Sequence, residues 1–246
     1  MKLRNIAMLL SNTGRSKAYL QAMCQRELFP EIVILLKEKE KEILPGQNTM
    51  DKKKTTALHI TNIYGFQLDF SEPLESTLKK YSLCYETIFS STINDAVVTT
   101  HLQALSPEII IYSGIGGILL KEETLAIGKK FLHVHGGYLP DFKGSTTQYY
   151  SLLKTNTCGA SAVFLTSTID SGPILHRKTF PPPEDRTTID YVMDSVYRTN
   201  VLIDTLAYYA KHGDWFYEKS KNNRGTTYYI IHPLLKHIAI YGRSPS

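Results

Sequence analysis

The chain has 246 residues, of which 42% are hydrophobic and 21% are charged, and its formal net charge is +5 at pH 7. This balance is ordinary for a globular protein, and the length suits one large domain with or without a small appendage. The positive charge lies largely in residues 37–41 and 52–54, which contain or neighbour acidic side chains, and not in one basic arm. The composition therefore gives no support for nucleic-acid binding.

Three cysteines, Cys24, Cys84 and Cys158, are far apart, odd in number and without metal-ligand spacing. We expect them to be buried thiols in a reducing compartment. The apolar run at residues 6–10 is too short for a signal-peptide core, and no stretch approaches the roughly 20 apolar residues that cross a bilayer. A cytoplasmic protein without membrane partners is expected.

The hydrophobic pattern predicts strands that alternate with helices, which is typical of an α/β fold with a parallel sheet and right-handed crossovers. Met8, Val33, Ile110 and Val134 are expected in the core of this sheet. Residues 37–61 are charged and poorly periodic, and they predict an exposed insertion. In chain order we expect a strand at 6–10, a helix at 17–26, a strand at 32–36, a helix at 71–81 capped by Ser71, a strand at 84–89, a helix at 93–105, a strand at 108–112, a helix at 121–127, a strand at 131–135, a helix at 145–154, strands at 160–167 and 174–180, a helix at 188–209, an edge strand near 228 and a last turn at 234–240.

Two histidines stand out at the end of the strand at 131–135. Side chains two apart in a strand share a face, so His133 and His135 point to one side while Leu132 and Val134 point to the other. A glycine pair follows, which permits a tight turn or the close approach of a ligand. Asp170 lies in a predicted turn between two strands, and its carboxylate can orient an imidazole and stabilise its charged form. This constellation indicates a functional site.

The residues around this site resemble a known family. His-Val-His-Gly-Gly-Tyr-Leu-Pro-Asp-Phe-Lys-Gly at 133–144, Thr-Cys-Gly-Ala-Ser-Ala-Val-Phe at 157–164 and Ile-Asp-Ser-Gly-Pro-Ile-Leu at 169–175 resemble the folate-dependent formyltransferases. That family includes glycinamide ribonucleotide, methionyl-tRNA and sugar N-formyltransferases. The strong match covers residues 108–179, and a weaker one extends back to residue 6. The resemblance implies a Rossmann-like fold and the transfer of a formyl group from 10-formyltetrahydrofolate to an amine.

The family's catalytic set is an asparagine, a histidine two residues later and a distant aspartate. By this resemblance, His135 manages protons, Asp170 orients it, and His133 stands where the family has the asparagine that donates to the formyl oxygen. Loss of one such donor costs on the order of 100- to 1000-fold in rate, so the departure bears on turnover. If His133 donates in its place, we expect His133→Asn to stay active and the activity of the wild type to titrate near pH 6–7, where imidazole does.

The resemblance also implies binding residues on both sides of the catalytic set. The loop at 11–16 looks like the substrate-phosphate loop of the purine enzymes, and the two folate loops of the family recognise the donor largely through backbone groups. The expected folate-binding residues are Gly116, Gly117, Ile118, Leu119, Thr166, Ser167, Thr168 and Ile169. The expected substrate-binding residues are Ser11, Asn12, Thr13, Gly14, Arg15, Ser16, Gly136 and Gly144.

The leading interpretation is an N-formyltransferase acting on a small amine, for which an amino sugar nucleotide is one candidate. We expect a catalytic domain over residues 1–210 and a short C-terminal extension over 211–246, too little for a second domain that holds RNA, and a homodimer is the protein partner to consider. Hydrolysis of the folate donor is a sibling reading. A metal-dependent hydrolase or oxygenase using His133, His135 and Asp170 is a different class, although no metal is the leading expectation. An inactive folate-binding homologue is a third.

Overall fold

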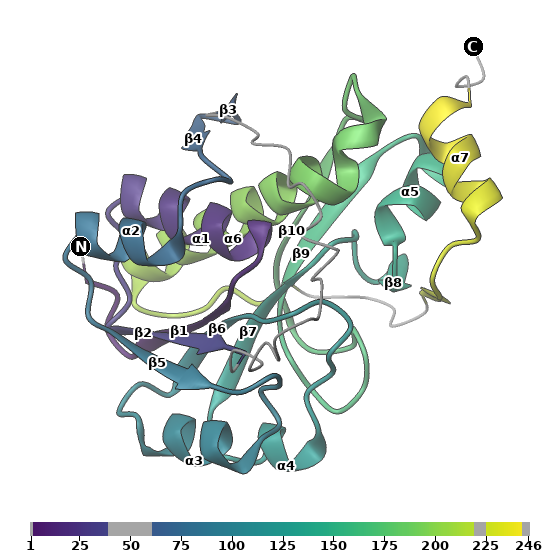
Figure 1. The fold of residues 1–246 in the computed structure, drawn as a ribbon. Coiled ribbons are helices and arrows are strands. Elements are labelled where there is room, and N and C mark those ends of the chain that lie inside the picture. Colours follow the sequence, from purple (N-terminus) through teal and green to yellow (C-terminus); the bar gives the residue numbers. More distant parts are fainter. Residues whose placement is uncertain (1, 39–60, 219–224, 243–246) are drawn as a thin grey trace, which may run out of the picture.

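A computed structural model of the chain, drawn in Figure 1, describes residues 2–38, 61–218 and 225–242. Seven strands of this described part form one sheet, and only β9 runs antiparallel to its neighbours. The mainly parallel sheet expected from the alternation of strands and helices is thus confirmed. The spatial order is β10 (Ile174–Phe180), β9 (Cys158–Phe164), β7 (Lys130–His135), β6 (Ile109–Ser113), β1 (Ile6–Ser11), β2 (Ile32–Lys37) and β5 (Tyr85–Phe89).

Helices cover both faces of the sheet, so each strand is buried on both sides (Figure 1). Helices α1 (Gly14–Gln25), α2 (Leu74–Lys80) and α6 (Asp194–His212) lie over one face, and α3 (Ala96–Ala104) and α4 (Glu122–Leu125) lie over the other. The expected core residues Met8, Val33 and Val134 are buried in the first layer and Ile110 in the second. Burial on both faces explains why the strands appear as continuous apolar runs.

The last part of the chain packs beside the carboxyl ends of the strands. Strand β8 (Phe142–Gly144) pairs in parallel with β11 (Thr226–Tyr228), and α5 (Thr147–Thr155) contacts α7 (Pro233–Tyr241). The edge strand expected near residue 228 therefore joins a small separate sheet, not the large one. The ring of Tyr228 stacks on those of Phe142 and Tyr150, with centroid distances of 5.7 and 4.4 Å. The remaining elements are the hairpin β3 (Thr61–Ile63) and β4 (Phe66–Leu68), and the turns η1 (Arg186–Thr188) and η2 (Ile189–Met193) that lead into α6.

Gly144 allows the β8–β11 pairing because it has a φ of +91° and a Cβ placed there would lie 2.1 Å from the carbonyl oxygen of Tyr228. We expect Gly144→Ala to lower the free energy of unfolding by about 1 to 3 kcal/mol through backbone strain alone, and by more if the strands separate. Chemical denaturation measures this effect. Gly116→Ala is the matched control, because no atom lies within 4 Å of that Cβ position. Equal stability of the two variants would contradict the prediction.

Several helices begin at other residues than the pattern predicts. Helix α1 begins at Gly14, three residues early, because the hydroxyl of Thr13 accepts the N–H of Ser16 and caps it. Helix α2 begins at Leu74, because the carboxylate of Asp69 accepts the N–H groups of Ser71 and Glu72 and holds them in a turn. Helix α3 begins at Ala96 instead of residue 93. Most of the expected insertion, residues 39–60, lies outside the described residues.

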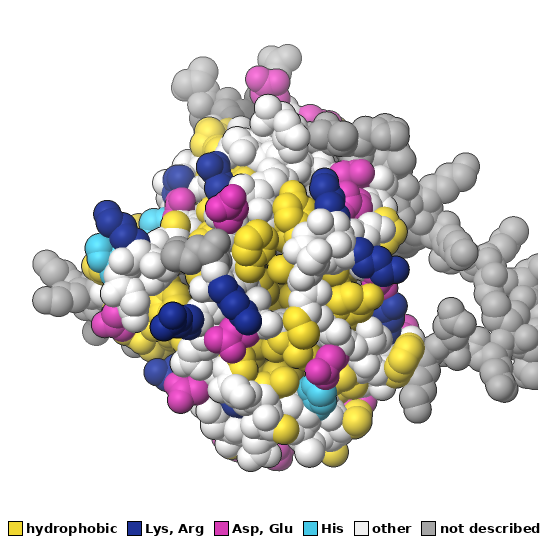
Figure 2. Space-filling view, turned by 90° about the vertical axis from the view of Figure 1, so that its left-hand side faces the viewer, with side chains coloured by type: hydrophobic (Ala, Val, Ile, Leu, Met, Phe, Trp, Pro, Cys, Tyr) yellow, Lys and Arg dark blue, Asp and Glu magenta, His cyan; other side chains and the backbone are white. Residues whose placement is uncertain are grey.

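The cysteines and the surface complete this description. Cys24 and Cys158 are buried, and burial raises the pKa of both thiols to about 12. Cys84 is exposed, so the expectation of three buried thiols is wrong at this position. No helix in the described ranges is long and apolar enough to cross a membrane. On the face shown in Figure 2, basic and acidic side chains are interspersed and neither sign forms a continuous field.

Candidate active site

The two histidines lie at the carboxyl end of β7, opposite Val163 and Ser161 of β9. The chain runs outward from β1 to β2 and β5, then returns to β6 on the other side of β1. Open α/β sheets bind ligands in the crevice at such a reversal, outside the carboxyl ends of the strands. His133, His135 and Asp170 meet beside this crevice, so the structure brings the predicted set together.

Asp170 and His135 form a buried pair. The Nδ1 atom of His135 lies 3.3 Å from Oδ1 of Asp170, and the side chains are 7% and 10% exposed. Asp170 has a φ of +49°, in the left-handed region, and its Oδ2 accepts the N–H of Gly144 at 2.7 Å. The other ring nitrogen of His135, Nε2, lies 2.8 Å from the carbonyl oxygen of Phe142. Both nitrogens of His135 therefore face acceptors.

The charge of His135 is set by opposing effects. Burial lowers the pKa of its ring, the carboxylate of Asp170 raises it, and the nearby guanidinium of Arg198 lowers it. The lowering is the larger effect. Because a carbonyl cannot donate, Nε2 must carry a proton in either charge state. A second proton lies between Nδ1 and Asp170, which keeps the pair hydrogen-bonded.

His133 is held neutral by its surroundings. Burial lowers the pKa of its ring well below 6.5, and the charges of Arg15, Arg198 and His135 add to this effect, while the backbone of Tyr112 opposes it. Its Nδ1 atom is enclosed by protein and has no hydrogen-bond partner among the described residues. The ring lies 6.1 Å from that of Tyr112. The expectation that His133 titrates near pH 6–7 is therefore wrong, because an ordinary imidazole pKa requires solvation and the absence of nearby cations.

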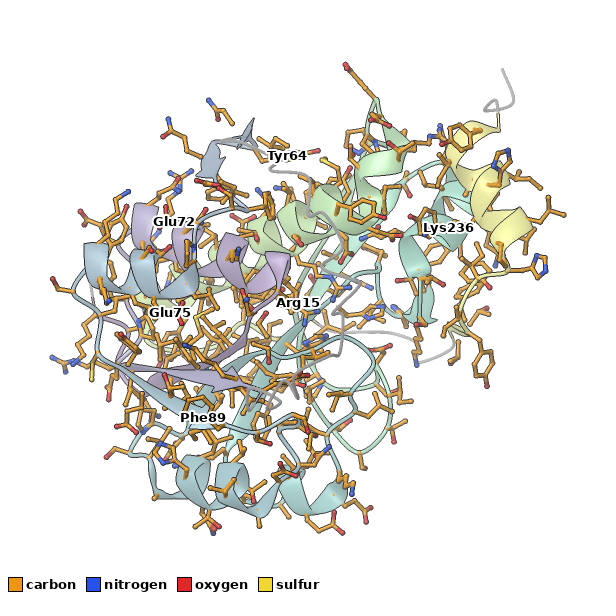
Figure 3. The ribbon with its side chains drawn as sticks, viewed as in Figure 1. Arg15, Tyr64, Glu72, Glu75, Phe89 and Lys236 are labelled. Carbon is orange, nitrogen blue, oxygen red and sulfur yellow. The ribbon has the colours of Figure 1, made fainter. Side chains whose placement is uncertain are left out.

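Two guanidinium groups line the crevice near the histidines. Arg15, labelled in Figure 3 near the carboxyl edge of the sheet, donates to the hydroxyl of Ser113 at 3.1 Å and to the carbonyl of Gly114 at 2.5 Å. Arg198 donates to Asp194 at 2.7 Å and to the carbonyl oxygen of Val134 at 2.9 Å. Both groups are partly buried and keep positive charge beside the site.

Two adjoining cavities open at this place. The smaller, about 130 Å³, has mostly apolar walls, and the larger, about 600 Å³, has polar and charged walls. His133 and Asp170 line both, whereas His135 lines only the larger. Of the predicted residues, Ile118, Leu119 and Ile169 line both cavities, Thr166 and Ser167 the smaller, and Gly116, Gly117, Gly136, Gly144 and Arg15 the larger. Thr168 lines neither, and its carbonyl oxygen accepts from Thr166.

The loop at 11–16 is divided between several environments. Arg15 reaches the larger cavity, while Ser11 and Asn12 line a third cavity of about 490 Å³ at the ends of β1, β2 and β5. Ser16 is fully buried and bonds to Ser113, and Thr13 caps α1. A Cβ on Gly14 would meet the ring of Phe70. The loop therefore does not present all six of its residues to one ligand as the sequence predicts.

The sequence analysis missed the part of the site that α6 contributes. Asp194 bonds to Arg198 and to Gln148 of α5, and a Cβ on Gly136 would lie 2.4 Å from both charged side chains. The available signal is the spacing of Asp194 and Arg198, which puts an acid and a base on a helix face that also carries the buried Val201 and Leu202. The analysis also missed Tyr112 and the wall formed by residues 227–230.

The ligand set of a metal site does not form. His135 faces Asp170 and the carbonyl of Phe142, so its nitrogens do not converge with those of His133 on one point. Within the ranges that the structure describes, no group of three or more His, Cys, Asp or Glu side chains could hold a metal ion.

Comparison with curated proteins gives partial matches. The chain is 26% identical over 122 residues to the methionyl-tRNA formyltransferase of Roseiflexus sp. (strain RS-1), a match that covers 49% of this chain and 38% of that protein. It is 30% identical over 91 residues to the methionyl-tRNA formyltransferase of Finegoldia magna, covering 37% of this chain and 29% of that protein. The matches thus span well under half the length of these relatives.

Solved structures share the fold over nearly the whole chain. A sugar N-formyltransferase from Shewanella sp FDAARGOS_354 matches with a TM-score of 0.56 at 14% identity, covering 96% of this chain and 86% of that one. HypX from Aquifex aeolicus in complex with tetrahydrofolic acid has a TM-score of 0.56 at 11% identity, covering 98% of this chain and 34% of that one. The family model described as "Formyl transferase" matches residues 4–202. The chain therefore belongs to the formyl transferase family.

Proposed function

We propose that the protein transfers the formyl group of 10-formyltetrahydrofolate to the amine of a small molecule, with His133, His135 and Asp170 as the catalytic residues. The observation that carries the proposal is the meeting of two unlike cavities at these side chains. A group-transfer enzyme needs its donor and acceptor to approach within about 3 to 3.5 Å between reacting atoms. The common border of the cavities at His133 and Asp170 provides such a place.

The smaller cavity suits the flat ring of a folate donor. Its walls are largely apolar side chains, Tyr112, Ile118, Leu120, Leu125 and Leu165 among them, and residues 166–169 supply backbone polar groups. An apolar slot with a few polar groups is the usual form of a site for a ring-shaped cofactor. The likeness to HypX in complex with tetrahydrofolic acid agrees with this assignment. Folate bound here would supply the activated formyl carbon.

The larger cavity suits a polar acceptor. Arg15 and Arg198 supply positive charge, Asp194 and Asp190 supply negative charge, and Gln148 adds an amide. Mixed charges of this kind favour a small molecule with several polar groups, such as an amino sugar nucleotide, over a purely apolar amine. The fold shared with sugar N-formyltransferases is compatible with that acceptor class.

The test is a screen of amino sugar nucleotides, glycinamide ribonucleotide and simple amines with 10-formyltetrahydrofolate, with tetrahydrofolate and the formylated product both measured. Formylation of any amine, abolished in the double variant His135→Ala, Asp170→Ala, is the expected result. Release of formate without a formylated amine would identify a hydrolase. Tetrahydrofolate binding without turnover of any kind would identify an inactive homologue.

A further inference from the structure

The hydrogen bonds of His135 leave it unable to receive a proton from a substrate. Its Nε2 atom donates to the carbonyl of Phe142 and its Nδ1 atom meets Asp170. A ring with acceptors at both nitrogens has no lone pair to offer. Yet an attacking amine must lose a proton when it becomes an amide, so another group near the formyl carbon has to accept that proton.

His133 has the properties that this role requires. It lines both cavities, whereas His135 lines only the larger one. Its Nδ1 atom is enclosed by protein, so Nε2 is the nitrogen that can meet a bound molecule. Tyr112 lies beside it on the neighbouring strand β6, and the Tyr112 backbone stabilises a ring proton. A proton kept on the enclosed Nδ1 leaves the lone pair of Nε2 directed at the ligand.

We propose that His133, and not His135, is the general base of the reaction, accepting the amine proton at Nε2. This inference rests on the proposed function and assigns one step within it. It also reverses the role expected from the family's asparagine, which donates a hydrogen bond to the formyl oxygen. The charges of Arg15 and Arg198 keep His133 in its neutral, proton-accepting form.

The step balances without another reactant. The amine nitrogen attacks the formyl carbon, the carbonyl electron pair moves to the oxygen, and the nitrogen becomes positively charged. His133 then takes one proton from that nitrogen. As the carbonyl re-forms, the bond from carbon to N10 of the folate breaks, and His133 returns the proton to N10. The negative charge on the oxygen raises the proton affinity of the nearby ring at the moment the proton arrives.

Turnover of variants separates a proton acceptor from a hydrogen-bond donor. Removal of a general base costs about 100- to 10,000-fold in rate, so we expect kcat to fall by this factor in both His133→Ala and His133→Asn, with tetrahydrofolate binding retained. Added imidazole should partly restore His133→Ala. His101→Ala is the matched control, because His101 pairs with Glu86 on the far side of the sheet and lines none of the three cavities. Near-wild-type kcat in His133→Asn would overturn the proposal, since an amide can replace a donor but not a base.

A second measurement does not depend on finding the acceptor. Nitrogen-15 NMR of the histidine side chains of the intact protein reports the charge and tautomer of each ring. We expect His133 to be neutral at pH 7, with its proton on Nδ1, and to stay neutral well below pH 6.5. A charged His133 at pH 7, or a proton on Nε2, would overturn the inference. If the wild type formylates no amine but shows the expected tautomer, the proposed function fails and the proton-accepting geometry stands.

Discussion

Asp170→Asn is expected to lower the turnover of formyl transfer by about 100- to 10,000-fold, the range found when a residue that supports proton transfer is removed. The carboxylate accepts from two donors at once, Nδ1 of His135 and the N–H of Gly144. An asparagine has only one accepting oxygen, so one of these donors loses its partner. The measurement is kcat with saturating donor and amine, together with tetrahydrofolate affinity and circular dichroism.

The matched control for this substitution is Asp141→Asn. Asp141 is an exposed carboxylate between His135 and Gly144, and it lines none of the three cavities. Its loss removes the same charge close to the site without touching the pair. We expect this variant to keep its turnover and its fold. Near-normal turnover of Asp170→Asn would exclude Asp170 from catalysis.

Asp194→Ala is expected to lower the free energy of unfolding by about 3 kcal/mol, because removing one partner of a buried ion pair leaves the other charge uncompensated. Arg198, whose side chain is 17% exposed, would then lie close to Arg15 with no carboxylate bonded to it. Gln148 would also lose the oxygen to which its amide donates. Urea denaturation of the two proteins measures the difference.

The ion pair also has a signature in the pH dependence of stability. Although burial raises the pKa of Asp194, the charges of Arg198 and Arg15 and the amide of Gln148 lower it further, so the net shift is downward. A carboxyl whose folded pKa is depressed contributes stability above its unfolded pKa and loses it as pH falls through the folded value. Asp190→Ala is the control, because Asp190 pairs with Lys236 at side-chain exposures of 42% and 37%, and such pairs contribute about 0 to 1 kcal/mol. Equal loss in both variants would contradict a special role for Asp194.

The strands were predictable because each is a continuous apolar run that must be covered on both faces, as at Ile6–Ser11 and Ile109–Ser113. Helix starts were less predictable, because side chains compete with the helix for the same N–H groups. Asp69 binds two N–H groups that a helix begun near Ser71 would have used, and the helix begins at Leu74 as a result. Local hydrogen bonds of this kind depend on the folded path of the loop.

Within the site, the two histidines and Asp170 could be located from the strand alternation and the resemblance, but their hydrogen bonds could not. The partner of His135 at Nε2 is a backbone oxygen seven residues away, and it arrives there only because of the turn at residues 136–141. Arg198 contacts the oxygen of Val134 across 64 residues of sequence. Neither spacing is periodic, so no pattern in the sequence announces it.

The pairing of β11 with β8 places residues 227–230 in the wall of the larger cavity, although the family model ends at residue 202. Tyr229 and Ile230 are each 81% exposed, so little packing constrains what stands there. Related enzymes that share the sheet and the donor slot can therefore diverge in the amine they admit by exchanging a short peptide at the end of the chain. Selection for a new acceptor would then leave the histidines and the folate walls untouched.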